Sequence, residues 1–211
     1  MNSYTFPFNS CEKPQHNSQP YSTAVTLGIC AIVFYFLLIA NTFSSRLFIF
    51  ALLIFNLFHT SSHYMHIENA KNIQFLLTHF SAIFASLTLV YLLYCKTNHP
   101  PPNLYLLTAL YLFDIFLISM NYPHIVNIIT FVIILVYIIA TYYRHFSRQI
   151  QEKCRLIAAA TILTLIIQLL EIKYCHTLLQ LLPNFPFHIL VEIVGGVAIY
   201  LLCSLALLKM N

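Results

Sequence analysis

Long apolar stretches separated by short polar breaks run along almost the whole chain. A helix that crosses the hydrocarbon core of a membrane needs about 20 mostly apolar residues. Seven stretches come up to that length, and they cover 23–43, 46–66, 73–95, 103–121, 123–143, 155–174 and 186–208. The pattern predicts an all-α fold, a bundle of seven transmembrane helices over residues 23–211 that follows a polar segment over 1–22.

The breaks between the stretches contain asparagine, proline and charged residues, which interrupt apolar helices. The shortest break is Asn121–Pro123, so the fourth and fifth stretches are nearly fused, and we favour seven spans over six. The sixth stretch lies between the breaks Arg144–Arg155 and Cys175–Pro186. We therefore expect the sixth span to begin and end at these two breaks.

The composition agrees with a membrane protein. Of the 211 residues, 60% are hydrophobic and only 8% are charged, whereas about a quarter of the residues of a soluble domain are charged. Residues 1–20 have no apolar core of a secretory signal, so we expect insertion to begin at the first span. The chain has a net charge of +4 but no basic patch with interleaved aromatic residues, so no nucleic-acid partner is expected.

The distribution of lysine and arginine predicts the orientation of the bundle, because cytosolic loops carry an excess of these residues. With seven spans, three of them lie on the side of the N-terminus: Lys13, Lys71 and Lys173. Seven lie on the other side: Arg46, Lys96, Arg144, Arg148, Lys153, Arg155 and Lys209. The N-terminus is therefore expected to be lumenal or extracellular and the C-terminus cytosolic, in an endomembrane (ER or Golgi) or the plasma membrane.

This topology brings two distant groups of polar residues to the same depth. His59, His63 and His66 fall at i, i+4 and i+7 in the second span, so they share one helix face. His188 and Glu192 are also four residues apart, at the outer end of the seventh span. Both groups lie in the outer half of the membrane, and His79 of the third span lies within about two turns of them.

Imidazole and carboxylate groups inside apolar spans are costly and indicate function with a partner. Zinc prefers these ligands, and two histidines with one glutamate form a known catalytic set. We expect His59, His188 and Glu192 to bind Zn²⁺, with His63 and His66 as secondary candidates. Zinc activates water and polarises a carbonyl, which suits hydrolysis of a lipid amide or ester. The alternative is that such histidines only hydrogen-bond neighbouring helices.

Two of the six cysteines lie on the outer side of the predicted topology. These are Cys11, in the N-terminal segment, and Cys175, in the break before the seventh span. An oxidising compartment permits a disulfide where two thiols meet. A Cys11–Cys175 disulfide would tie the N-terminal segment to that break, and two free thiols are the alternative.

Four short segments, in order along the chain, resemble those of the alkaline ceramidase family. This family belongs to a wider group of seven-span membrane hydrolases that includes the adiponectin-receptor-like proteins. The segments are Cys11–Lys13 with Gln19 and Pro20, Phe58–Thr60, Glu171–Cys175, and His188–Glu192 followed by Gly195, Gly196 and Tyr200. The resemblance covers essentially the full chain and is carried by the order and spacing of the segments.

The resemblance implies a zinc-dependent hydrolase that cleaves ceramide or a related membrane lipid into a sphingoid base and a fatty acid. It places the zinc ligands at His59, His188 and Glu192 and implies the Cys11–Cys175 disulfide. Some family members also bind Ca²⁺ through the N-terminal acidic segment. Here that site is eroded, with Glu12 plainly retained.

The chain departs from the family pattern at three positions. Glu192 stands where the family has a second histidine, and Phe55 stands where it has a serine. The aspartate of the third span has no clear match, and the nearest residues are Thr78 and His79. A shifted register would use Ser62 and His66 as the serine–histidine pair. The candidate catalytic residues are thus Thr78, His79 and Ser62, and the rival function is that of an inactive lipid-binding or interaction protein.

Overall fold

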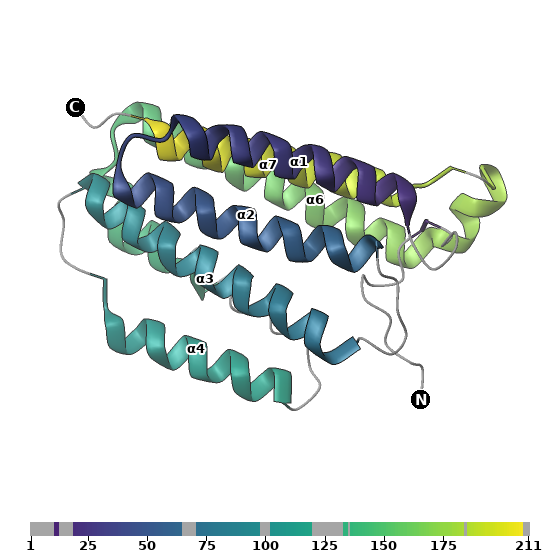
Figure 1. Ribbon diagram of the computed structural model, residues 1–211, viewed down its shortest axis with the longest axis horizontal. Helices are drawn as coiled ribbons and strands as arrows, with labels where there is room; N and C mark the ends of the chain where they lie inside the picture. Colours follow the sequence, from purple (N-terminus) through teal and green to yellow (C-terminus); the bar gives the residue numbers. More distant parts are fainter. Residues whose placement is uncertain are drawn as a thin grey trace.

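The computed structural model describes residues 11–12, 19–64, 71–97, 102–119, 133–134, 136–183 and 185–208, with the backbone alone at 71–76, 104, 114–115, 117–119 and 172. All regular structure in this part of the chain is helical (Figure 1). The helices are α1 (Pro20–Ile39), α2 (Phe43–Tyr64), α3 (Lys71–Thr97), α4 (Leu104–Ser119), the short 3₁₀ helix η1 (Tyr143–His145), α6 (Arg148–Leu181) and α7 (His188–Leu207). Residues 133–134 and 136–142, before η1, are helical as well. The predicted all-α class is therefore confirmed.

Five helices of the described residues are long and apolar enough to cross a membrane. They span Pro20–Ile39, Phe43–Tyr64, Leu77–Thr97, Arg148–Glu171 and His188–Leu207. They correspond to five of the seven expected spans, so the architecture fits an integral membrane protein. Most of the expected fifth span, 123–143, lies outside the described residues, and α4 is 16 residues long. The count of seven and the orientation therefore stay predictions.

The expected limits of the sixth span were wrong as limits of a helix. Helix α6 begins at Arg148, where Ser147 caps it by accepting a hydrogen bond from the Ile150 N–H at 3.4 Å. It runs on through Cys175 to Leu181, so Cys175 lies in a helix and not in a loop. Hydropathy marks the depth of the membrane, whereas arginine, glutamine, glutamate and lysine are good helix formers that extend the helix beyond it.

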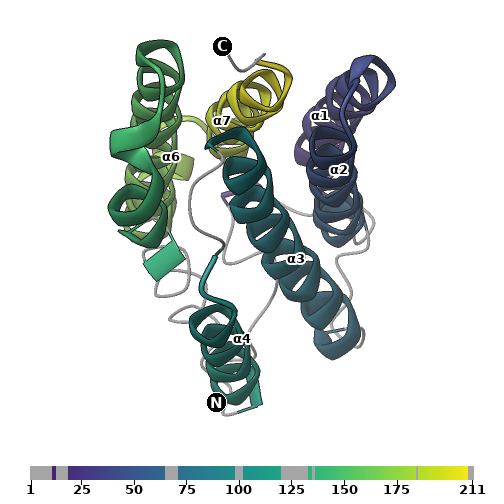
Figure 2. The ribbon, with the colours of Figure 1, turned by 90° about the vertical axis from the view of Figure 1, so that its left-hand side faces the viewer.

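Helix α7 lies at the centre of the packing. It packs against α6 on one side and α1 on the other, while α2 packs between α1 and α3 (Figure 2). One apolar core joins α1, α2, α3 and α7 around residues such as Val33, Ile49 and Cys203. A second joins α3, α4 and α7 to the segment before α6 around residues such as Leu93 and Tyr142. Large apolar side chains cover the outside of the bundle, as expected where lipid replaces water.

Polar contacts tie the helices together at both ends of the bundle. At one end, the Gln19 N–H donates to the carbonyl of His63 at 2.9 Å, joining the start of α1 to the end of α2. At the opposite end, the Ser45 hydroxyl donates to the Ala206 carbonyl at 2.7 Å. The candidate site lies at the first of these ends.

Candidate metal centre

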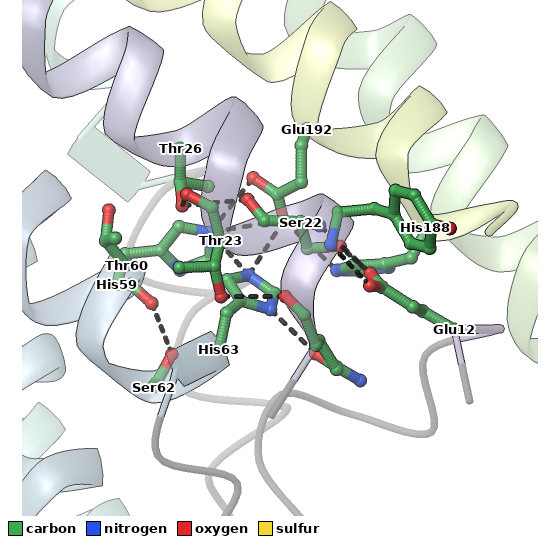
Figure 3. A network of polar contacts seen from close by, with 12 residues as sticks. Glu12, Ser22, Thr23, Thr26, His59, Thr60, Ser62, His63, His188 and Glu192 are labelled. Carbon is green, nitrogen blue, oxygen red and sulfur yellow. Dashed lines mark hydrogen bonds and ion pairs between the residues drawn. The ribbon is translucent and has the colours of Figure 1, made fainter. Parts of the chain in front are cut away.

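Side chains from two helices converge on the carboxylate of Glu192. Nε2 of His59 lies 3.2 and 3.1 Å from its two oxygens, and Nε2 of His63 lies 3.1 Å from Oε1. The two Nε2 atoms are 3.3 Å apart, because residues four positions apart on α2 project from one face. Figure 3 shows both rings turned toward Glu192, which reaches them from α7. These three residues form the metal cluster, a group compact enough to hold a metal ion.

His188 lies against the same carboxylate from one turn away on α7. Its Nε2 is 3.1 Å from Oε1 of Glu192, at an angle that does not make a hydrogen bond. This buried nitrogen has no hydrogen-bond partner among the described residues. The other ring nitrogen, Nδ1, donates to the carboxylate of Glu171 on α6 at 2.9 Å. The arrangement of carboxylate and imidazole is the one that orients histidine ligands in metal sites.

A similar contact fixes the ring of His63. Its Nδ1 donates to Oε1 of Gln19, just before α1, at 2.7 Å. Because Nδ1 carries the proton in both rings, neutral His63 and His188 turn the lone pair of Nε2 toward the carboxylate of Glu192. Two lone pairs facing a carboxylate repel it, and the repulsion ends when a cation or an added proton lies between them.

The distances in the metal cluster fit a tetrahedral metal ion. Bonds of about 2.0–2.1 Å from zinc to nitrogen or oxygen give edges of about 3.3 Å between neighbouring ligands. The Nε2–Nε2 distance between His59 and His63 is 3.3 Å, and their shortest distances to Glu192 are 3.1 Å. Imidazole nitrogen and carboxylate oxygen are also the ligand types that zinc prefers. The residues present are therefore compatible with a metal ion, and zinc as that metal stays a prediction.

His59 is the member of the metal cluster that is open to the surroundings. Its side chain is 23% exposed, whereas that of His63 is fully buried. The ring stacks on Phe55, one turn earlier, with 5.9 Å between ring centroids and 16° between planes. Phe55 thus holds the ring of His59 in place.

A cavity of about 260 Å³ adjoins His59 and Glu192. All five of the long helices contribute to its wall, α1 through Ile29 and α2, α3, α6 and α7 through two or more residues each. The polar lining residues are Asn56, His59, Thr78, His79, Thr164, Gln168, His188 and Glu192. The apolar ones are Ile29, Phe55, Ala82, Val191, Gly195, Gly196 and Ile199. The cavity therefore offers polar and apolar surface to one ligand.

The candidate catalytic residues fall in different places. Thr78 and His79 of α3 are buried and line the cavity. Ser62 does not line it, because its hydroxyl donates to the carbonyl of His59 within α2 (Figure 3). His66, the second of the secondary ligand candidates, lies outside the described residues. Of the expected ligands, His59 and Glu192 belong to the metal cluster, together with the secondary candidate His63. His188 lies against Glu192 but is not a member of the cluster.

Cys11 and Cys175 form a disulfide, with 5.4 Å between their Cα atoms. The bond holds the N-terminal segment against α6. The backbone N–H of Cys11 donates to Oε1 of Glu171, the residue that also accepts from His188. The disulfide therefore lies two hydrogen bonds away from Nε2 of His188.

Glu12, the expected calcium ligand, caps α1. One oxygen accepts from the backbone N–H of Tyr21 at 2.8 Å, and the other accepts from the N–H and hydroxyl of Ser22. These donors fill both oxygens, and the positive end of the helix dipole favours the negative charge. The structure gives Glu12 a capping role, and calcium binding at this residue stays a prediction.

Three residues of the site were missed by sequence reasoning: Gln19, Glu171 and Gln168. Gln19 and Glu171 entered only as parts of the resemblance, without a role beside a histidine. The spacing of polar residues on α6 was a signal that could have identified Gln168 and Glu171. Thr164, Gln168, Glu171 and Cys175 recur every three or four residues in an otherwise apolar helix, which predicts a polar stripe facing the bundle interior.

Comparisons with protein-family models, curated proteins and solved structures find no match to this chain.

Proposed function

We propose that this protein is a metal-dependent hydrolase within the membrane that cleaves the amide bond of a ceramide-like lipid, releasing a sphingoid base and a fatty acid. The observation that carries the proposal is the convergence of His59, His63 and Glu192, of which His59 and Glu192 line a partly apolar cavity. Buried imidazoles and a carboxylate in apolar helices are costly without a partner. A zinc ion shared by the two helices is that partner, and His188 is the further nitrogen beside it.

Zinc held there supplies Lewis-acid polarisation of the scissile carbonyl and of a water molecule. The chain's own residues then orient the lipid and move protons. His79 lines the cavity and is the candidate general acid–base: it takes the proton of the attacking water and passes it to the amide nitrogen as the C–N bond breaks. Thr78, beside it in the chain, is the candidate hydrogen-bonding group for the substrate.

We further propose seven spans with the metal cluster at the lumenal or extracellular end. The Cys11–Cys175 disulfide supports this orientation, because disulfides persist where a protein faces an oxidising compartment. Basic side chains at the opposite end also support it, since cytosolic ends are rich in lysine and arginine. Lys96 and Lys153 lie there, and both donate to residues at the end of α7. An endomembrane or the plasma membrane meets these conditions.

A second function, that of an inactive lipid-binding protein, is favoured by two positions where the resemblance leads us to expect a catalytic serine. Phe55 replaces the family's serine and stacks on His59, and the Ser62 hydroxyl is held by the backbone of its own helix. An inactive protein that binds lipid in the same cavity would have no need of either hydroxyl.

One experiment separates these functions. The full-length protein is purified without chelator, its metal content is measured, and release of fatty acid from ceramides is followed before and after chelation. Hydrolysis that is lost on chelation and restored by zinc supports the proposed function. Bound zinc without any hydrolysis of ceramides supports the inactive lipid-binding protein. Purified protein that contains no metal and gains none from added zinc contradicts the metal site itself.

A further inference from the structure

The cavity beside the metal cluster is polar at one end and apolar at the other. Helices α6 and α7 pack side by side, and two contacts show how far the cavity extends along them. Glu171 contacts His188 near the outer end. Thr164, seven residues before Glu171 on α6, faces Gly195, seven residues after His188 on α7, because the two helices run in opposite directions. Seven residues are two helical turns, or roughly 10 Å. The cavity wall therefore continues about two turns deeper than the histidines.

The deep end of the cavity is suited to an alkyl chain. Ile29, Ala82, Gly195 and Ile199 line it there. The Thr164 hydroxyl donates to the Ala160 carbonyl at 2.9 Å, so the side chain turns its methyl group toward Gly195. Apolar surface of this kind binds methylene groups.

The polar end, in contrast, holds a hydrogen-bonding group that makes no hydrogen bond within the described part of the chain. This group is the carboxamide of Gln168, which lines the cavity one turn from Glu171. A carboxamide both donates and accepts, so it can pair with the amide or hydroxyl groups of a lipid. A ligand with its polar linkage beside Gln168 and Glu192 would extend its chain past Gly195.

The two neighbouring glycines differ in what a side chain would meet. A Cβ at Gly195 would lie 3.8 Å from the Thr164 methyl, an ordinary contact, so alanine fits there and projects at the cavity wall. A Cβ at Gly196 would lie 2.9 Å from Cδ1 of Ile29, so the Ile29 side chain would have to shift to make room for it. Packing against Ile29 is tight at Gly196, whereas Gly195 has room for a methyl group.

We propose that Gly195 sets the longest acyl chain that the cavity accepts, because the absence of a side chain there leaves room for the chain to pass toward Ile199. The inference rests on the proposed function in that the ligand is a lipid amide whose linkage lies at the metal cluster. Beyond that function, it assigns to Gly195 the discrimination among such lipids by acyl-chain length.

The chain provides its own control for the test, since Gly28 lies on the outer surface of α1 and a Cβ there would meet nothing within 4 Å. The full-length protein and its variants G195A and G28A are compared in detergent micelles. Displacement of a fluorescent fatty acid by ceramides with short, medium and long acyl chains gives the affinities. Hydrolysis of the same ceramides is measured in parallel, and thermal unfolding verifies that each variant is folded.

We expect G195A to lower the affinity for the longest chains about tenfold, the equivalent of withdrawing roughly two methylene groups from the cavity. Affinity for short chains stays unchanged, and G28A matches the natural protein at every length. Thr164→Ala, which removes the facing methyl group, shifts the preference toward longer chains and serves if G195A does not fold.

The proposal is overturned if G195A, or Thr164→Ala in its place, leaves the length profile unchanged or weakens all lengths equally. It is also overturned if the natural protein binds none of the ceramides. Binding with the expected length profile but without hydrolysis contradicts the proposed function and leaves the role of Gly195 standing. Hydrolysis of ceramides with the same length profile in G195A as in the natural protein supports the proposed function and contradicts the role of Gly195.

Discussion

The carboxylate of Glu171 accepts a hydrogen bond from Nδ1 of His188 at 2.9 Å, and both side chains are buried. The proton is thereby held on Nδ1. In the neutral ring, Nε2 of His188 then faces Glu192 with a lone pair that can bind a metal ion. Glu171 belongs to α6 and His188 to α7, so the contact also fixes how these helices meet at the site. Four predictions follow from this and related contacts.

Glu171→Gln is expected to weaken metal binding about 10- to 100-fold, as is typical when the partner of a ligating histidine is changed. The amide is uncharged and no longer holds the ring of His188 as firmly. Zinc affinity is measured by competition with a chromophoric chelator. Glu152→Gln is the matched control, because Glu152 is exposed and pairs with Arg148 on the surface. Equal affinities for both variants would contradict the role of Glu171.

His63→Ala is expected to abolish stoichiometric metal binding as completely as His59→Ala does. Both residues are members of the metal cluster, and each supplies one Nε2 atom to it. Metal content of the purified variants is measured by mass spectrometry. His176→Ala, an exposed histidine on α6, should retain its metal. Should His63→Ala keep the metal while His188→Ala loses it, the ligands would instead be those that the family resemblance implies.

Removal of the Cys11–Cys175 disulfide is expected to lower the free energy of unfolding by about 2–5 kcal/mol. The bond links residues 164 positions apart and holds the Cys11 N–H on Glu171. Thermal unfolding of C11S, C175S and the double variant is compared without reductant. All three should lose the same amount, because each lacks the same bond. A double variant much less stable than either single one would show that the cysteines act separately.

Glu12→Ala is expected to destabilise the protein by about 1–2 kcal/mol, the usual effect of losing a helix cap. The carboxylate accepts from the first N–H groups of α1, and this role needs no calcium. Thermal unfolding is therefore measured in buffer that contains a calcium-selective chelator. If the variant and the natural protein unfold alike there, and differ only when calcium is added, Glu12 acts as a calcium ligand.

Hydropathy predicted the helices well because a membrane leaves few choices for a polar backbone. Apolar runs of about 20 residues must form helices there, and five of the expected spans are helices of that length. Hydropathy could not give the ends of α6, since Arg148–Arg155 is polar and still helical. Membrane depth and helix length are separate properties of this segment.

The candidate site was predictable to the extent that it follows from depth and periodicity. Equal depth placed His59 level with Glu192, and their Nε2 and Oε2 atoms do lie 3.1 Å apart. The polar stripe of α6 indicates that Glu171 faces the bundle interior. Which histidine Gln19 and Glu171 contact depends on how α1 and α6 pack around α2 and α7, and no local pattern encodes that packing. Ser62 shows the converse: its spacing suggested a role, but its hydroxyl found an acceptor within its own helix.

The position of Glu192 in the chain has a consequence for biosynthesis. Glu192 comes 129 residues after His63 and 133 after His59, and it lies in the last helix. During synthesis, α2 is therefore made before Glu192, and its two histidines have no acidic partner until α7 has been synthesised. The metal cluster can be completed only when α7 is inserted, so a truncated or stalled chain would be left with exposed imidazoles that quality-control factors could recognise. Loading of metal would then report that α7 has been inserted.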